Sequence, residues 1–239
     1  MARMVKEQEH AEKRRDILDA VLRLIYTKGY ERMTIQDILE DCQISSGAFY
    51  HYFDSKPAVL EAFIERMQVD TEKPLVAIVQ DTHLTAIEKL QRFFGTLDQL
   101  RITHKASIIE LLRVWYTDGN AIVRQKVDDA IFARRAPLLR AIVHQGLSEG
   151  IFTTAFPDQA SGIILSLLQG MATTHAGLML SLQSEGNQER VVAGVVAVHA
   201  AYMDAIERVL GAPQACLYRN DAAAVQMWVA ALRGGDFAG

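Results

Sequence analysis

The chain has 239 residues, half of them hydrophobic, and a formal net charge of −4. This length and composition can build a substantial core and exclude an intrinsically disordered chain, while the acidic balance gives no sign of a nucleic-acid binder from composition alone. The two cysteines, Cys42 and Cys216, match no metal-binding or redox spacing. The N-terminal residues also lack the apolar core of a secretory signal, so we expect a reduced, cytoplasmic protein.

The first predicted element is a helix from about Glu9 to Lys28. Its apolar residues recur at helical spacing, and Lys28-Gly29 is a typical helix stop. The N-terminal part of this helix carries three cations. They either form a solvated face or reach the phosphates of a nucleic acid, and both interpretations stay open for Lys13, Arg14 and Arg15.

Residues 34–56 predict two short helices joined by a tight turn. Thr34 can cap the first helix, whose apolar positions recur at helical spacing. The pattern breaks at Gln43-Ile44, and Ser45 or Ser46 supplies a new N-cap. The second helix begins with small residues, so its backbone can approach another surface closely. This is typical of helix-turn-helix proteins, in which the start of the second helix meets base edges.

The same stretch resembles the DNA-binding domain of the tetracycline-repressor (TetR) family. That family typically shows Ser-x-Gly-x-hydrophobic-Tyr-x-His/Tyr-Phe-x-Ser-Lys, and the residues in register here are Ser45, Gly47, Phe49, Tyr50, Tyr52, Phe53, Ser55 and Lys56. The chain departs from the family at Gln43, where a turn glycine is usual, and at Leu39 and Cys42, where small residues are customary. None of these departures removes a DNA-facing group.

The resemblance implies an all-α fold with two parts. A helix-turn-helix three-helix head would occupy residues 1–56, and a larger helical body for effector binding and dimerisation would occupy residues 57–239. A helix over about 57–72 would link them, since its pattern stops near Pro74. Helical periodicity then predicts helices over about 84–101, 105–117, 121–148, 157–182, 189–210 and 222–232. The most apolar segment, 163–182, contains polar residues, so we expect a buried helix and no membrane span.

Ten residues are candidate DNA contacts by the resemblance and by helix-turn-helix geometry. They are Thr34, Gln36, Ser45, Ser46, Gly47, Ala48, Tyr50, His51, Tyr52 and Lys56. The two serines, the two tyrosines and Lys56 would mainly fix the register on phosphates, while Ala48, Tyr50 and His51, with Gln36, would lie nearest the bases. Residues 1–56 hold nine Lys or Arg against ten Asp or Glu, so any positive surface must come from placement.

Small residues recur every four positions in two helices of the body. Such rows permit close packing of a partner helix. Packing within the chain would also explain them, but the resemblance favours a two-fold, four-helix dimer interface through Gly162, Ser166, Gly170, Thr174, Ala193, Ala197 and Ala201. Segments that line the effector cavity in the family contribute Trp115, Tyr116, Met171 and His175. Few charges interrupt the apolar helices of the body, so an apolar or aromatic effector is favoured.

The resemblance therefore implies a homodimeric, ligand-responsive transcriptional regulator, most often a repressor. It would bind a near-palindromic DNA operator and leave it when a small-molecule effector binds. The chain has no G-x-S-x-G, H-E-x-x-H, Walker A or C-x-x-C motif, so we expect no catalysis, no metal and no cofactor. The alternative is a protein-recruiting helical module with a degenerate DNA-binding head, for which the acidic balance leaves room.

Overall fold

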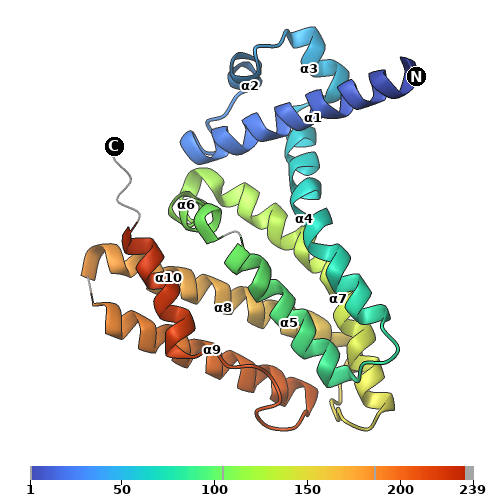
Figure 1. Ribbon diagram of the computed structural model, residues 1–239, viewed down its shortest axis with the longest axis vertical. Helices are drawn as coiled ribbons and strands as arrows, with labels where there is room; N and C mark the ends of the chain where they lie inside the picture. Colours follow the sequence, from blue (N-terminus) through green and yellow to red (C-terminus); the bar gives the residue numbers. More distant parts are fainter. Residues whose placement is uncertain (1, 104, 186, 235–239) are drawn as a thin grey trace. The chain divides into compact units, whose positions relative to one another are not determined.

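The computed structural model describes residues 2–103, 105–185 and 187–234, and within these ranges it contains helices and no strand (Figure 1). The all-α prediction is therefore confirmed. In chain order the elements are α1 Ala2–Thr27, α2 Ile35–Cys42, α3 Ser46–Tyr52, α4 Lys56–Gln80, α5 Ala86–Thr103, α6 Lys105–Trp115, the 3-10 helix η1 Asp118–Asn120, α7 Ala121–Ser148, α8 Pro157–Glu185, α9 Gln188–Leu210 and α10 Ala222–Gly234.

Two predicted helix boundaries were wrong. The first helix, α1, begins at Ala2 and not near Glu9, because polar residues with good helix propensity extend it beyond its apolar stripe. The linking helix does not stop at Pro74 but continues to Gln80. A proline inside a helix removes one backbone hydrogen bond, and the fully buried Leu75 directly after it keeps the helix packed. The other helices begin and end within one turn of the predicted positions.

The chain divides into two compact units. The first holds residues up to Asp70 together with Arg113–Ala130, and the second holds Thr71–Leu112 and the residues from Ile131 on. The unit boundaries fall inside α4 and α7 as well as near the end of α6. The functional division between residues 56 and 57 stays a prediction.

The first unit contains the two short helices that the sequence predicts, and local caps set their ends. Thr34 and Asp37 form a reciprocal capping box at the start of α2. At its end, Gln43 adopts a left-handed conformation with φ 53°, and its N–H bonds to the carbonyls of Leu39 and Glu40. A residue with a Cβ is strained in this conformation, which glycine adopts freely. The turn that resembles the family's glycine turn is therefore built here with glutamine.

Asn120 joins the end of α1 to η1. Its side chain is fully buried, its Oδ1 accepts a 2.8 Å hydrogen bond from the N–H of Tyr30, and its Nδ2 donates to the carbonyls of Ile25 and Val114. Gly29 beside it has φ +77°, and a Cβ there would lie 3.3 Å from the carbonyl oxygen of Gly119. One amide side chain thus satisfies three backbone groups. It does so where the segment after α1 lies close to η1, although the two are far apart in sequence.

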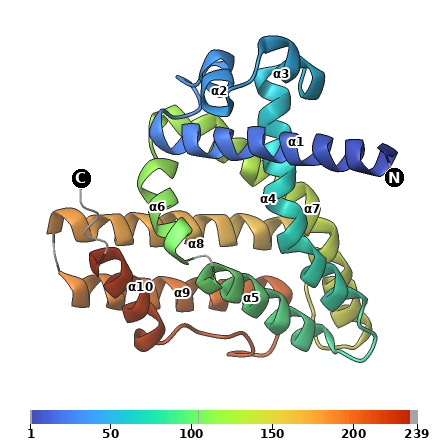
Figure 2. The same ribbon diagram turned by 45° about the horizontal axis from the view of Figure 1, so that its top comes forward.

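In the second unit, α8 and α9 lie side by side and pack against each other, as Figure 2 shows. The main core of this unit joins five segments through buried residues such as Phe93, Leu139, Ile164 and Ile206. A smaller core forms where Val225 and Val229 of α10 pack on α9, together with Leu182, Val191, Val192 and Val195. The C-terminal helix is therefore an integral part of this unit.

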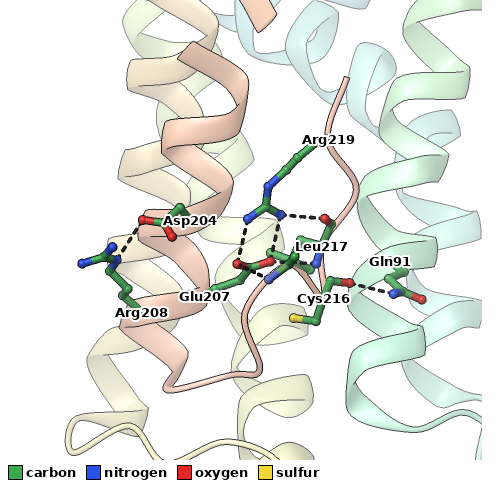
Figure 3. Close-up of polar contacts among 8 residues, drawn as sticks. Gln91, Asp204, Glu207, Arg208, Cys216, Leu217 and Arg219 are labelled. Carbon is green, nitrogen blue, oxygen red and sulfur yellow. Dashed lines mark hydrogen bonds and ion pairs between the residues drawn. The ribbon is translucent and has the colours of Figure 1, made fainter. Parts of the chain in front are cut away.

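Glu207 holds the connection between α9 and α10 in place (Figure 3). Its buried carboxylate accepts hydrogen bonds from the N–H groups of Ala215 (3.0 Å) and Leu217 (2.8 Å) and from both terminal nitrogens of Arg219 (2.8 and 2.7 Å). Burial alone would raise the pKa of Glu207, but these hydrogen bonds and the Arg219 charge lower it to about 2. The carboxylate thus stays ionised and fully paired inside the protein.

The segment Pro157–Leu182 of α8 is long and apolar enough to cross a membrane, with a mean hydropathy of 1.4 over its most apolar stretch. Only 22% of that stretch is buried, so the prediction of a buried helix was wrong for most of its residues. The physical reason is that α9 and the core cover one side of α8. The other side, which includes Ile163, Ser166 and Thr174, is exposed.

We expect Asn120→Ala to lower the free energy of unfolding by about 2–4 kcal/mol, since three buried backbone groups lose their partner. Urea unfolding followed by circular dichroism measures the change. The matched control is Gln125→Ala, which removes an exposed amide that donates to Asp129 on the surface and should change stability by less than about 0.5 kcal/mol. Equal effects of the two substitutions would contradict the role assigned to Asn120.

We expect Gln43→Gly to raise the free energy of unfolding by about 0.5–1 kcal/mol, because glycine adopts the left-handed conformation without strain. Gln43→Ala is the control, since it keeps the Cβ and therefore the strain. Both are measured by the urea midpoint. A gain with alanine as large as with glycine would show that the side chain of Gln43, and not its backbone conformation, limits stability.

Candidate nucleic-acid interface

The second helix of the helix-turn-helix, α3, has one buried anchor and one outer face. Ser45 caps its start, where Oγ accepts a 3.2 Å hydrogen bond from the N–H of Ala48. Phe49 is fully buried, whereas Tyr50 is 50% exposed and His51 is also exposed. The buried Phe49 therefore anchors the helix on one side, while polar aromatic side chains face solvent on the other. A helix that reads a DNA groove needs such an outer face.

The start of α3 is open on its outer side. Ser46 and Gly47 are exposed, and a Cβ added at Gly47 would meet one neighbouring atom within 4 Å, the Oγ of Ser45 at 4.0 Å. The packing of the chain itself would therefore tolerate a side chain at this position. Glycine would be required here if another molecule approached the backbone closely.

The predicted contacts on α2 are partly occupied in the protein itself. The hydroxyl of Thr34 accepts a 3.1 Å hydrogen bond from the N–H of Asp37, and the Asp37 carboxylate accepts from the N–H of Thr34. Hydrogen bonds from Lys28 and Thr34 lower the pKa of Asp37 to about 2. Gln36 is exposed, and its amide donates to Glu40 at 2.9 Å.

Several cations of the first unit are paired with carboxylates. Arg23 pairs with Asp41 and Lys28 pairs with Asp37, and Lys13 lies 3.7 Å from Asp16. Such surface pairs contribute little stability, but each cancels a charge that could otherwise attract phosphate. These three pairs therefore reduce the positive charge that the first unit can offer to phosphate.

Lys56 points back onto the first unit. Its Nζ lies 4.3 Å from the centre of the Tyr30 ring and donates a 3.2 Å hydrogen bond to the carbonyl of Glu31. Partial burial lowers the pKa of the ammonium group. The ammonium group is therefore held near the start of α4 by an aromatic face and a carbonyl, and its contact with phosphate stays a proposal.

A cluster of aromatic rings lies at the end of α3. The imidazole of His10, from α1, lies 4.5 Å from the ring of Tyr52 and 5.5 Å from that of His51, centre to centre. His51 and Tyr52 are themselves 5.3 Å apart. The sequence indicates two of these residues but not His10, because no local pattern joins positions so far apart on two helices.

The four predicted effector-binding residues fall in different units. Trp115 and Tyr116 belong to the first, where Arg124 donates to the Trp115 carbonyl at 2.6 Å and lies 5.4 Å from the Tyr116 ring centre. Met171 and His175 are on α8 in the second unit. Their role as effector contacts stays a prediction for both pairs.

His175 has a buried imidazole neighbour on α9. The ring of His199 lies 6.2 Å from that of His175, centre to centre, and is 4% exposed. Burial lowers the pKa of both histidines to about 4; the His199 charge acts further on His175, and that of Arg219 on His199. Both imidazoles are therefore neutral at pH 7, when each carries one donor and one acceptor nitrogen.

The predicted dimer residues lie mostly on the exposed sides of α8 and α9. Gly162 and Gly170 are half-buried, and a Cβ on Gly170 would lie 3.0 Å from the hydroxyl of Tyr202. The other five are exposed: Ser166, Thr174, Ala193, Ala197 and Ala201. Packing of α8 against α9 therefore does not account for these five small residues.

Comparison with known proteins gives matches of different extent. The HTH-type transcriptional regulator YuxN of Bacillus subtilis is 47% identical over 49 residues, which are 20% of this chain and 17% of YuxN. The HTH-type transcriptional regulator ArpR of Pseudomonas putida is 34% identical over 135 residues, 55% of this chain and 64% of ArpR. The chain thus spans less than two thirds of the length of each of these relatives.

A solved structure extends the likeness over most of the chain. SmeT in complex with triclosan matches with a TM-score of 0.61 at 16% identity, over 88% of this chain and 97% of SmeT. At that identity the match shows the fold alone. SmeT is the repressor of the Stenotrophomonas maltophilia multidrug efflux pump SmeDEF.

Two family models match two separate parts of the chain. Residues 17–63 match the bacterial regulatory proteins of the tetR family. Residues 109–175 match the tetracyclin repressor-like C-terminal domain. The first range contains α2 and α3 with their caps, and the second contains most of α6 to α8. With the helix-turn-helix geometry and the fold of SmeT, these matches identify the chain as a member of the tetracycline-repressor (TetR) family of transcriptional regulators.

Proposed function

We propose that the protein is a homodimeric transcriptional repressor of the cytoplasm. It binds a near-palindromic DNA operator through α3 and releases it when a small-molecule effector binds. The observation that carries this proposal is the geometry of α3, with Phe49 buried, Ser45 capping the start and an open, exposed surface at Gly47, Tyr50 and His51. A transcriptional regulator needs no catalytic group, metal or cofactor for this task.

The contacts with DNA divide into two kinds. Ser45, Ser46, Tyr50, Tyr52 and Lys56 position the protein on phosphates. Ala48, Tyr50 and His51 face the bases. Thr34 and Gln36, at the start of α2, add further contacts. Phosphate contacts carry no sequence information, whereas contacts with base edges do. Apart from Tyr50, which belongs to both sets, the two kinds of contact are therefore separable by substitution.

The exposed side of α8 supports dimerisation. An apolar helix of which 22% is buried in its most apolar stretch leaves a surface that water solvates poorly. The small residues on α8 and α9, such as Ser166, Thr174 and Ala197, allow two helices of a second copy to approach closely. A homodimer would also provide two α3 helices for two half-sites, about 34–36 Å apart on the operator.

An effector would act by shifting a population. A ligand that binds one form of the dimer better than the other shifts the equilibrium by its difference in affinity, and useful regulation takes about 1–3 kcal/mol. SmeT, which shares the fold, has been solved with triclosan. We propose an apolar or aromatic effector that contacts Trp115, Tyr116, Met171 or His175, with the neutral imidazoles as polar partners.

Selection of bound fragments from random duplex DNA, at near-physiological salt, tests the proposal. We expect enrichment of a near-palindromic motif, because a two-fold dimer reads two inverted half-sites. Lys56→Ala should weaken binding to all sequences about three- to tenfold, whereas His51→Ala should change the preferred bases. Light scattering of the same sample gives the mass of the dimer.

The outcomes separate the proposal from its rival. A folded dimer that enriches no motif would favour a protein-recruiting module with a degenerate head, for which the paired cations of the first unit are the supporting observation. A monomer with no enrichment would contradict both dimerisation and operator reading. An unchanged preference in His51→Ala would remove that side chain from the base contacts.

The neutral imidazoles of His175 and His199 predict acid sensitivity. Both pKa values lie near 4 in the folded protein, below the usual 6.5. Between these values the unfolded chain binds more protons than the folded one, so the stabilisation is complete above about pH 6.5 and is lost as the pH falls towards 4. We expect a loss on the order of 3 kcal/mol over this range for each imidazole.

Urea unfolding at several pH values measures this dependence. His199→Leu removes one buried imidazole and should flatten the slope between pH 6.5 and 4. The control is His83→Gln, which replaces an exposed histidine and should leave the slope unchanged. A slope that is identical in wild type and His199→Leu would show that His199 is not neutral at pH 7 through burial.

A further inference from the structure

The first unit is short of positive charge where it must meet DNA. Residues 1–56 hold nine basic and ten acidic side chains, and ion pairs engage Lys13, Arg23 and Lys28. Lys56 lies on the Tyr30 ring. DNA binding depends strongly on cations that replace counterions along the phosphates. Additional cationic groups at the surface would therefore change affinity considerably.

Residues 1–56 contain two histidines, His10 and His51, and the fold brings them together. Their ring centres are 5.5 Å apart although one is on α1 and the other on α3. Both are exposed. Their protonation would change the formal charge of these 56 residues from −1 to +1, since the count of basic and acidic groups differs by one. Histidine is the side chain that gains a proton between pH 8 and 5.

An aromatic ring and a helix end lie beside the two imidazoles. The half-buried Tyr52 ring lies 4.5 Å from His10 and 5.3 Å from His51, and an aromatic face attracts an imidazolium. His51 is also in the last turn of α3, where the helix dipole favours positive charge. Tyr52 thus contacts both imidazoles, with the His10 ring tilted by 38° and the His51 ring edge-on at 80°.

Nearby charges on both helices are mixed. On α1 the described neighbours are Glu9, Lys13 and Arg14, of which Arg14 lies over the Phe53 ring at 5.1 Å. Asp54 follows α3. Two imidazolium groups with ring centres 5.5 Å apart would experience mutual repulsion. A phosphate oxygen beside them would offset it.

We propose that protonated His10 holds a DNA phosphate beside the base-facing His51, whose protonation adds positive charge next to it, so that DNA binding takes up protons and tightens as the pH falls from about 7.5 to 6.0. The inference rests on the proposed DNA-binding function. It adds His10 of α1 to the proposed DNA contacts, as a residue that binds phosphate. Because the contact is to phosphate, it acts on any duplex sequence.

The test measures binding of the full chain to a fluorescent random-sequence duplex by anisotropy at pH 7.5 and 6.0. We expect wild-type affinity to rise at least about fivefold at pH 6.0, and the slope of log affinity against log salt to steepen by about one per phosphate gained. His10→Gln should lose much of the pH effect, and His10→Gln/His51→Gln should lose nearly all of it. His83→Gln, at an exposed histidine elsewhere, should behave as wild type.

Circular dichroism at both pH values confirms that every variant is folded. DNA binding with the same pH dependence in wild type and in the double variant would overturn the histidine contact and leave the DNA-binding function standing. Binding by wild type without pH dependence would do the same. A folded wild-type protein that binds no duplex at either pH would overturn the proposed function and the inference together.

Discussion

The burial of Phe49 is the interaction on which the DNA-reading surface depends. A helix of seven residues, such as α3, is not stable by itself in water, because nucleation costs more than so few hydrogen bonds return. Phe49 is fully buried and Phe53 nearly so, and Ser45 satisfies one of the orphan N–H groups at the start. With the apolar side fixed in this way, Ser46, Gly47, Tyr50 and His51 of α3 are exposed.

The second constraint is charge. Arg23 pairs with Asp41 and Lys28 pairs with Asp37, so these two charges are less available to attract DNA. We propose that such a head binds DNA through a few well-placed groups, mainly helix termini and hydroxyls, and not through a broad basic surface. The position of each group therefore matters more here than the total charge.

The sequence predicted what depends on neighbouring residues. The cap at Thr34 and the cap at Ser45, one of two alternatives, follow from short patterns, and the structure shows both. The resemblance places a turn at Gln43, which the structure shows in the left-handed conformation. The contact between Asn120 and Tyr30 spans 90 residues, and that between His10 and Tyr52 joins two helices, so no local pattern indicates either. The predicted end of α4 near Pro74 was wrong because proline weakens a helix only locally. Buried residues on either side of it, such as Ile64 and Leu75, decide whether the helix continues.

The helix α9 shows two opposite ways of keeping a polar group inside a protein. Glu207 is charged and accepts four hydrogen bonds, which compensates the cost of burying it. His199, two turns earlier, is neutral because burial disfavours its charge. Tyr218 connects the two groups: it lies 6.3 Å from the His199 ring, centre to centre, and stands between Leu217 and Arg219, which Glu207 binds. The carboxylate therefore fixes one side of the surroundings of the imidazole.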